Sequence, residues 1–239
     1  MNVVVLTGAG VSAESGIRTF RDTGGLWETH DLATVATPEG FAANPALVHR
    51  FYSERRLALR GVQPNPAHTA LGRLERELGE RLTLVTQNVD DLHERGGAAE
   101  TLHMHGELLQ MLCGRCGTRW RWEGESTVET VCPACGARLP SADPLSVPRP
   151  DVVWFGEMPL HMPAIERAVM DADLFASIGT SGEVYPAAGY VALARACGAR
   201  TVEINLEPSA NAEMFDEQRL GRAGELVPLW VEEVLREAA

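Results

Sequence analysis

The sequence predicts an α/β fold built on a doubly wound, mostly parallel β-sheet, with a small cysteine-bearing insertion and a small helical module. Short apolar runs alternate with amphipathic segments along most of the chain. A glycine-rich turn follows the first run, and two C-x-x-C pairs lie in a stretch that breaks the alternation. The length of 239 residues fits one large domain or two unequal ones, since a domain averages roughly 150 residues.

Short apolar runs are expected to form the strands. Residues 3–6 are mostly β-branched and lead directly into the glycine-rich turn, which is typical of a buried strand. The other expected strands are residues 82–86, 100–105, 151–155, 174–178 and 201–204. A polar segment, residues 87–93, is expected at the carboxyl end of the second of these strands.

Amphipathic segments between these runs are expected to form helices. Residues 66–79 carry an apolar stripe at helical spacing, and residues 44–61 have a proline in the first turn and a glycine at the end. Further helices are expected at residues 163–171, 186–197 and 229–237. The alternation therefore predicts helices packed on both faces of the sheet.

Composition and charge exclude several classes of function. Arginine supplies all 21 basic residues and lysine is absent, which excludes a Schiff-base lysine, a P-loop lysine and a lysine general base. The net charge of −12 disfavours stable nucleic-acid binding, because an acidic surface repels phosphate backbones. The chain shows neither a basic leader nor an apolar run of about 18 residues, so we expect a soluble, cytoplasmic protein without membrane contact.

Two cysteine pairs have the spacing of a zinc site. Cys113 and Cys116 precede Cys132 and Cys135 with 15 residues between the pairs, and a glycine follows each pair. Four thiolates complete a tetrahedron and leave no position for water, so we expect one structural zinc ion rather than a catalytic one. Cys197 stands alone in an apolar helical segment and is expected to be a small buried side chain.

The glycine-rich turn fits a nucleotide-binding pattern. Residues 8–13 (GAGVSA) match G-x-G-x-x-G/A between the first strand and a helix start at residues 12–15. Glycines at these positions allow a pyrophosphate to approach backbone N–H groups, although a plain tight turn is an alternative interpretation. An ordinary dehydrogenase has a second strand before an acidic residue about 20 positions on. Glu28 stands at that distance, but loop-like residues 16–27 precede it, so hydride transfer is disfavoured.

Several motifs, taken in order, resemble the sirtuins, a family of NAD-dependent protein-lysine deacylases. Residues 8–22 (GAGVSAESGIRTFRD) resemble the first family signature and residues 87–93 (QNVDDLH) the second. Residues 103–107 (HMHGE) resemble the catalytic histidine motif, and the cysteine pairs follow it. Residues 149–157 (RPDVVWFGE), 179–181 (GTS) and 204–205 (IN) complete a resemblance that spans nearly the whole chain.

The resemblance implies a reaction in which the acyl oxygen of an acyl-lysine attacks the ribose of NAD and displaces nicotinamide. A base then activates a ribose hydroxyl, and the products are free lysine, nicotinamide and O-acyl-ADP-ribose. His105 is the implied base, and an imidazole that titrates near neutrality suits this step. The implied partners are acyl-lysine proteins or peptides, and no oligomerisation signal is visible, so a monomer is expected.

The resemblance also implies the residues that contact NAD. They are Gly8, Ala9, Gly10, Ser12, Ala13 and Glu14; Ile17, Arg18, Thr19, Phe20, Arg21 and Trp27; Gln87, Asn88, Val89 and Asp90; Gly179, Thr180 and Ser181; and Asn205, Leu206, Glu207 and Ala223. Phe20 is the side chain implied to shield the reacting ribose from water.

Tyr52 and Arg55 resemble a pair found in a bacterial subgroup that removes acidic acyl groups. Their i, i+3 spacing places them on one helix face. A guanidinium can bind a carboxylate through two hydrogen bonds and a phenol can donate another, so the pair implies a succinyl or malonyl pocket. The alternative is a solvated helix face, with Glu54 and Arg56 alongside. Residues Val153, Phe155, Gly156 and Glu157 are implied to pair with an extended substrate peptide.

These observations predict three modules. Residues 1–27, 62–108 and 150–239 form a discontinuous Rossmann-like NAD-binding domain, residues 28–61 a helical module, and residues 109–149 a zinc ribbon. The proline-rich residues 140–150 are expected to be a stiff return linker. Two alternative functions remain: protein ADP-ribosyl transfer, and a zinc-ribbon adaptor whose nucleotide site only senses NAD.

Overall fold

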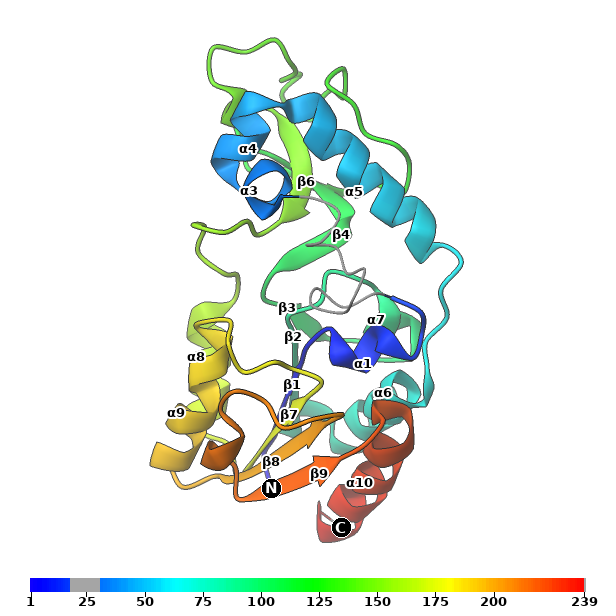
Figure 1. Cartoon of the computed structure of the whole chain (residues 1–239), viewed down its shortest axis with the longest axis vertical. Helices are drawn as coiled ribbons and strands as arrows, with labels where there is room; N and C mark the ends of the chain where they lie inside the picture. Colours follow the sequence, from blue (N-terminus) through cyan, green and yellow to red (C-terminus); the bar gives the residue numbers. More distant parts are fainter. Residues whose placement is uncertain (18–30, 239) are drawn as a thin grey trace.

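The computed structural model describes residues 1–17 and 31–238, and its larger part is built around a six-stranded parallel sheet (Figure 1). Its strands are β1 (Val3–Thr7), β2 (Leu82–Thr86), β3 (Thr101–His103), β7 (Leu174–Ile178), β8 (Arg200–Asn205) and β9 (Glu217–Leu220). They are arranged in the order β3-β2-β1-β7-β8-β9, and every neighbouring pair is parallel. The predicted parallel sheet is therefore confirmed.

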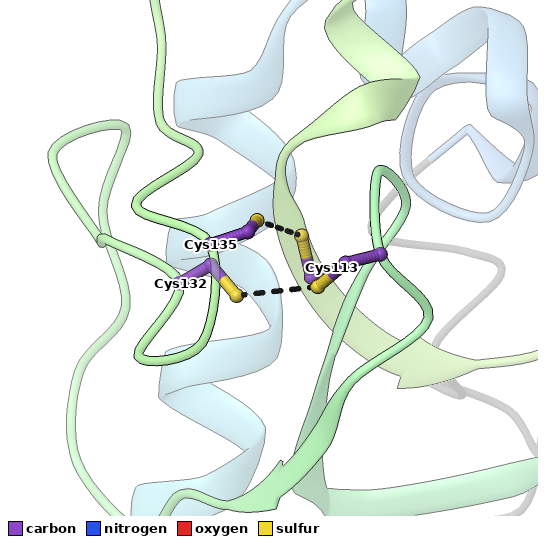
Figure 2. Close-up of side chains that lie close together, drawn as sticks. Cys113, Cys132 and Cys135 are labelled. Carbon is purple, nitrogen blue, oxygen red and sulfur yellow. Dashed lines mark hydrogen bonds between the residues drawn. The ribbon is translucent and has the colours of Figure 1, made fainter.

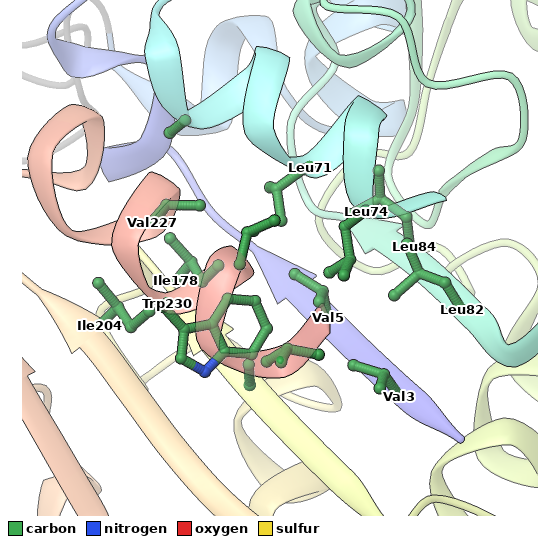
Figure 3. Packing of buried hydrophobic residues seen from close by; sticks show 14 of the residues in the cluster. Val3, Val5, Leu71, Leu74, Leu82, Leu84, Ile178, Ile204, Val227 and Trp230 are labelled. Atoms are coloured by element: carbon green, nitrogen blue, oxygen red, sulfur yellow. The ribbon is translucent and has the colours of Figure 1, made fainter. Parts of the chain in front are cut away.

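Helices cover both faces of this sheet, as predicted. Val3 and Val5 of β1 pack beneath α6 (Pro66–Leu78) and α10 (Ala223–Ala238), in the core shown in Figure 3. Val4 and Leu6 point to the opposite face, into a second core with residues of α8 (Met162–Met170) and α9 (Tyr190–Ala196). Since β1 is covered on both sides, its side chains are all buried, which explains its continuous apolar run.

Two details of the predicted helices are wrong. The last helix begins at Ala223 rather than at residue 229, because Pro228 lies near the start of α10 and removes only one backbone hydrogen bond there. The residues around it gain burial in return: Val227 and Trp230 are 0% and 1% exposed. Cys197 is exposed at the carboxyl end of α9 and is not a buried side chain.

A second sheet of three antiparallel strands lies beyond the first. It has the order β5-β4-β6, with β4 (Gly106–Cys113), β5 (Arg119–Arg121) and β6 (Pro148–Val152). The expected strand at residues 151–155 is thus wrong in position and in sheet. The expected linker at residues 140–150 also ends inside β6. This strand lies at the edge of its sheet, where prolines without an N–H are tolerated.

The helical module packs against the second sheet. It contains α3 (Leu32–Val35), α4 (Pro38–Ala43) and α5 (Pro45–Leu59). Arg56 of α5 is 1% exposed and donates from Nε to the Leu108 carbonyl oxygen (2.8 Å) and from Nη1 to Ser126 Oγ (3.1 Å). Burial lowers the pKa of Arg56 to about 10, which leaves it charged at neutral pH. This face of α5 is therefore not solvated at Arg56.

Short elements complete the chain. They are α1 (Gly10–Ala13), α7 (Leu92–Arg95) and single 3₁₀ turns at Gly79–Arg81, Pro144–Ser146, Ala187–Gly189 and Ala212–Met214. Within residues 1–17 and 31–238, no helix has the length and apolar character needed to span a membrane.

The four paired cysteines converge at the end of β4, which Cys113 occupies, and in the segment between β4 and β6 (Figure 2). The Sγ atoms of Cys113 and Cys135 are 3.7 Å apart, as are those of Cys116 and Cys132, and all four lie within 4.8 Å of one another. A tetrahedral zinc ion with Zn–S bonds of 2.3 Å gives sulfur–sulfur distances of about 3.8 Å. The four thiols are thus placed to bind a structural zinc ion.

The two halves of the cluster have the same local geometry. The N–H of Gly117 donates to the carbonyl oxygen of Cys113 (2.8 Å), and that of Gly136 donates to Cys132 (3.0 Å). Both glycines have positive φ, +71° and +69°, which a residue with a side chain rarely adopts. The apolar cluster here consists of little more than Cys113, Cys132 and Ala137, so the metal replaces a core.

We predict that Cys132→Ser disrupts zinc binding and destabilises this module. Loss of one of four ligands removes much of the metal's contribution to folding, so zinc should fall well below one ion per chain and Tm should fall by at least about 5 °C. Elemental analysis and thermal unfolding measure both quantities. Cys197→Ser is the matched control, since Cys197 lies outside the cluster. A Cys132→Ser protein with one zinc ion and an unchanged Tm would contradict the assignment.

Candidate functional site

The candidate site lies along the carboxyl edge of the parallel sheet. From β1 at the centre of the sheet, β2 and β3 are added toward one edge. The chain then crosses to the other side of β1, where β7, β8 and β9 are added toward the opposite edge. In sheets of this kind, ligands bind beyond the carboxyl ends of the strands where the order reverses, here between β1 and β7. Gly8 follows β1, Gln87 follows β2 and Gly179 follows β7. The sequence-predicted segments therefore meet at this edge.

The loops after β1 and β7 are in direct backbone contact. Gly10 donates its N–H to the Gly179 carbonyl oxygen (2.9 Å), and Gly8 donates to Ile178 (3.0 Å). A Cβ atom on Gly8 would lie 2.7 Å from the Gly179 oxygen, and one on Gly10 would lie 2.8 Å from the Gly179 Cα. Gly179 itself has φ +63°. The glycines are therefore required for contact between two loops of this chain, a reason different from the expected approach of a pyrophosphate.

Asn88, Ser12 and Asp90 form a buried polar network beside the glycine loop. Asn88 donates from Nδ2 to the Gly8 carbonyl oxygen (3.2 Å) and to Ser12 Oγ (3.1 Å). Ser12 in turn donates its single hydroxyl proton to Asp90 Oδ2 (3.2 Å). Burial raises the pKa of Asp90 even though hydrogen bonds from Ser12 and Leu92 oppose the shift. The network joins the first and second sequence signatures.

Two histidines that the sequence analysis did not select complete this network. His68 accepts at Nδ1 from the N–H of Asn65 (3.2 Å), so its Nε2 carries the proton and donates to Ser12 Oγ (3.3 Å). His93 Nε2 lies 2.9 Å from Thr7 Oγ1. Burial lowers the pKa of His68 to about 4 and that of His93 to about 3, so both are neutral at pH 7. A histidine on the apolar stripe of α6 was the signal that could have identified His68.

His103 and His105 differ in their protonation, which separates their chemical roles. His103 lies 3.0 Å through Nδ1 from the Asn88 carbonyl oxygen and 3.0 Å through Nε2 from Glu94 Oε1. Both partners are acceptors, so both ring nitrogens donate and the ring is cationic. Burial lowers the pKa of His103, but the hydrogen bond and charge of Glu94 outweigh it, so the net shift is upward.

His105 has the opposite character. Its Nδ1 lies 3.1 Å from the carbonyl oxygen of Gln87, which can only accept, so Nδ1 carries the proton and Nε2 keeps its lone pair. Burial lowers the pKa of His105, and the hydrogen bond to Gln87 opposes the shift. His105 is thus a neutral imidazole whose Nε2 can accept a proton.

The loops after β7, β8 and β9 form the other half of the edge. Asn205 donates from Nδ2 to the Thr180 carbonyl oxygen (2.7 Å) and accepts at its own carbonyl from Gly221 (2.9 Å). Helix α10 begins two residues after Gly221, at Ala223, and its Gly224 lies so near Glu14 that a Cβ atom there would meet the Glu14 carboxylate. These contacts bring the predicted ribose and adenine positions next to the glycine loop.

The remaining predicted positions that the structure describes fall in or near the same edge. Ala9 and Ala13 flank α1, Ile17 packs at the margin of the helical-module core, Val89 lies between Asn88 and Asp90, Ser181 follows Thr180, and Leu206 and Glu207 are exposed after β8. Arg18, Thr19, Phe20, Arg21 and Trp27 lie outside the described residues. Their predicted roles stay predictions.

Tyr52 and Arg55 share one face of α5, as their spacing predicted. The Arg55 Cζ atom lies 5.8 Å from the centre of the Tyr52 ring. Tyr52 is 1% exposed, and its hydroxyl oxygen accepts a hydrogen bond from Trp154 Nε1 (3.0 Å). Burial raises the pKa of Tyr52 and lowers that of Arg55. The negative charge of Asp90 acts on the pKa of Arg55 in the opposite direction, so the guanidinium lies within electrostatic range of the buried network.

The segment after β6 reaches back to the site. The N–H of Val153 donates to the His105 carbonyl oxygen (2.9 Å), and the N–H of Phe155 donates to Ala36 (2.9 Å). Glu157 accepts through its carboxylate from Arg149 Nη2 (2.8 Å) and from the backbone N–H of Trp154 (2.8 Å). Internal partners thus occupy the Val153 and Phe155 N–H groups and the Glu157 carboxylate. Pairing with a peptide would then depend on carbonyl groups and on exposed Gly156, which has φ +92°.

Comparisons with known proteins agree with this geometry. Residues 8–186 match the model of the Sir2 family. The NAD-dependent protein deacylase of Caulobacter vibrioides is 58% identical, over 98% of this chain and 97% of its own length. The NAD-dependent protein deacylase of Pasteurella multocida is 54% identical, over 98% of both chains.

Solved structures give the same result. A Sir2 homolog–NAD complex superimposes with a TM-score of 0.85 at 38% identity, covering 99% of this chain and 90% of the other. A mutant Sir2 homologue in complex with ADP-ribose gives a TM-score of 0.88 at 38% identity, over 99% and 92% of the two chains. With its sequence, fold and site in agreement, the chain belongs to the Sir2 family.

Proposed function

We propose that this protein is an NAD-dependent protein-lysine deacylase that removes acetyl groups and also acidic acyl groups such as succinyl and malonyl. Relatives that are 53–58% identical over 98% of this chain carry the name NAD-dependent protein deacylase. The observation that carries the proposal is His105, a neutral imidazole whose Nε2 keeps its lone pair, placed at the edge where the Sir2 signatures meet.

The residues of the carboxyl edge fit NAD as the co-substrate. The polar side chains Asn88 and Asp90 stand at the end of β2, where open α/β sheets bind ligands. NAD supplies an activated ribose whose nicotinamide leaves as the acyl oxygen attacks. Asn88 donates to both Gly8 and Ser12, so its side chain is held in one orientation and presents a fixed group to this ribose. The burial of Asn88 and Asp90 also strengthens their electrostatic interactions.

His105 supplies the base in this proposal. Its Nε2 lone pair accepts the proton of a ribose hydroxyl, which then attacks the carbon of the acyl group. The Gln87 carbonyl holds the Nδ1 proton, so the ring becomes cationic without turning. His103 cannot serve in this way, because both of its nitrogens already donate.

Arg55 and Tyr52 supply the preference for acidic acyl groups. The Arg55 guanidinium is half-buried beside an aromatic ring and has lost part of its hydration. A carboxylate that pairs with it replaces much of the favourable interaction with water that burial removed. The neutral Tyr52 hydroxyl adds a donor with no opposing charge. An acetyl group has no carboxylate and gains nothing from either residue.

The net charge of −12 supports the lack of stable nucleic-acid binding. A monomer in the cytoplasm that acts on acyl-lysine proteins is the state we propose.

We predict that His105→Ala lowers deacylation by at least about 100-fold, because positioned acid–base groups contribute about 10²–10⁴ to a rate. His103→Asn is the control, since it leaves the His105 base in place. In the wild type, deacylation should fall only below pH 6.5, because burial lowers the pKa of His105 and the neutral form is the active one. Retained deacylation in His105→Ala would contradict the role. Nicotinamide release without deacylation in the wild type would instead favour ADP-ribosyl transfer.

We predict that Arg55→Met lowers kcat/KM for a succinyl-lysine peptide by about 10-fold or more, since hydrogen bonds to charged groups contribute about 1.5–3 kcal/mol. The same peptide with acetyl-lysine should lose far less. Mass spectrometry of both peptides with NAD measures the two rates. Arg50→Met, on the same helix but at an exposed position, is the matched control. Equal losses on the two peptides would contradict the pocket.

A further inference from the structure

We propose that Trp154 is a positioning residue for acyl specificity: its indole N–H fixes the Tyr52 hydroxyl as a hydrogen-bond donor to the carboxylate of an acidic acyl group. This inference rests on the proposed function and adds a residue to it. Trp154 and Tyr52 are each 1% exposed, and the indole Nε1 lies 3.0 Å from the phenol oxygen.

The chemistry of the two groups determines the direction of this hydrogen bond. An indole nitrogen carries a proton and has no lone pair to offer, so it can only donate. The Tyr52 oxygen is therefore the acceptor, and the Tyr52 proton must point elsewhere. Within the described part of the chain, the structure gives the Tyr52 hydroxyl no second side-chain partner. A substrate carboxylate held by neighbouring Arg55 would be the acceptor that this proton lacks.

Protonation favours the same direction. Burial raises the pKa of Tyr52, so the phenol stays neutral and keeps its proton at neutral pH. A hydroxyl that accepts one hydrogen bond also becomes a stronger donor of another, because chains of hydrogen bonds polarise one another. Trp154 therefore does more than occupy space: it both orients the Tyr52 proton and strengthens it as a donor.

The indole is itself held in place from two sides. The Arg149 Cζ atom lies 4.1 Å from the centre of the Trp154 ring, within the range of a cation–π interaction. The Glu157 carboxylate accepts from both Arg149 Nη2 and the Trp154 backbone N–H. Phe41 closes the remaining side, with ring centres 5.2 Å apart. The Trp154 ring therefore has little freedom to turn its N–H away from Tyr52.

A double-mutant cycle tests the proposal. Trp154→Phe keeps an aromatic ring and removes the N–H, and we expect the ratio of succinyl to acetyl kcat/KM to fall about fivefold. Tyr52→Phe should lower the ratio at least as much, and adding Trp154→Phe to it should cause no further fall. Trp230→Phe, which removes an indole N–H from the distant sheet core, is the matched control. A merely structural role for Trp154 would lower both rates together and leave the ratio unchanged.

A second measurement follows the wild-type protein and needs one variant, Tyr52→Phe, only for assignment. With ¹⁵N-labelled tryptophan and no NAD, the Trp154 indole resonance should move downfield on binding a succinyl-lysine peptide and stay in place with an acetyl-lysine peptide. Its assignment comes from its shift in Tyr52→Phe.

The outcomes separate the two proposals. A wild type that removes no succinyl group overturns the acidic-acyl pocket and the role of Trp154 with it. If the wild type does remove succinyl groups, three results would each overturn the role of Trp154 alone. They are an unchanged ratio in Trp154→Phe, a fivefold fall on adding Trp154→Phe to Tyr52→Phe, and an indole resonance that does not move when the succinyl-lysine peptide binds.

Discussion

Contact between the loops that follow β1 and β7 is the constraint on which the rest of the structure depends. The two backbones approach so closely that a Cβ atom on Gly8 or Gly10 would meet Gly179, and hydrogen bonds join them at this distance. The contact joins the two loops at the carboxyl edge of the sheet, at the point where the strand order reverses. Two polar side chains of the candidate site are held by these loops, since Asn88 donates to Gly8 and Asn205 donates to Thr180.

The site shows how burial and directed hydrogen bonds assign protons. His103 faces two acceptors and holds two protons, whereas His105 faces one acceptor and holds one. His68 is neutral because it accepts from Asn65 and is buried. The same logic applies to Tyr52, whose role as acceptor from Trp154 leaves its own proton to donate. Histidines that lie close together thus have different roles because their hydrogen-bond partners differ.

Sequence patterns predicted the elements whose burial is continuous. The β1 strand is apolar throughout because helices cover both of its faces. Helix α6 has an apolar stripe because only one of its faces packs on the sheet. The strands β5 and β9 were missed because they are short and polar, at the edges of their sheets. The strand β6 was misplaced because its prolines suggest a linker, while an edge position tolerates them. Such edge positions are set by tertiary pairing, which local patterns do not encode.

The same division holds for the candidate site. The cysteine spacing predicted the metal cluster, and the order of the motifs predicted which segments meet at the sheet edge. Three partners of site residues, His68, Glu94 and Trp154, were not predicted, because their roles come from tertiary contacts that no local sequence pattern shows. The glycine loop was predicted for phosphate approach, whereas its glycines are explained here by contact between two loops.

The fate of the acyl group tests the central claim most directly. In the proposed reaction the acyl group moves from lysine to the ribose of NAD, so each deacylated lysine should appear with one nicotinamide and one O-acyl-ADP-ribose. Mass spectrometry of the small molecules from a succinyl-lysine peptide and NAD measures this stoichiometry. The account predicts O-succinyl-ADP-ribose and nicotinamide in equal amounts. Free succinate formed while NAD remains intact would contradict it.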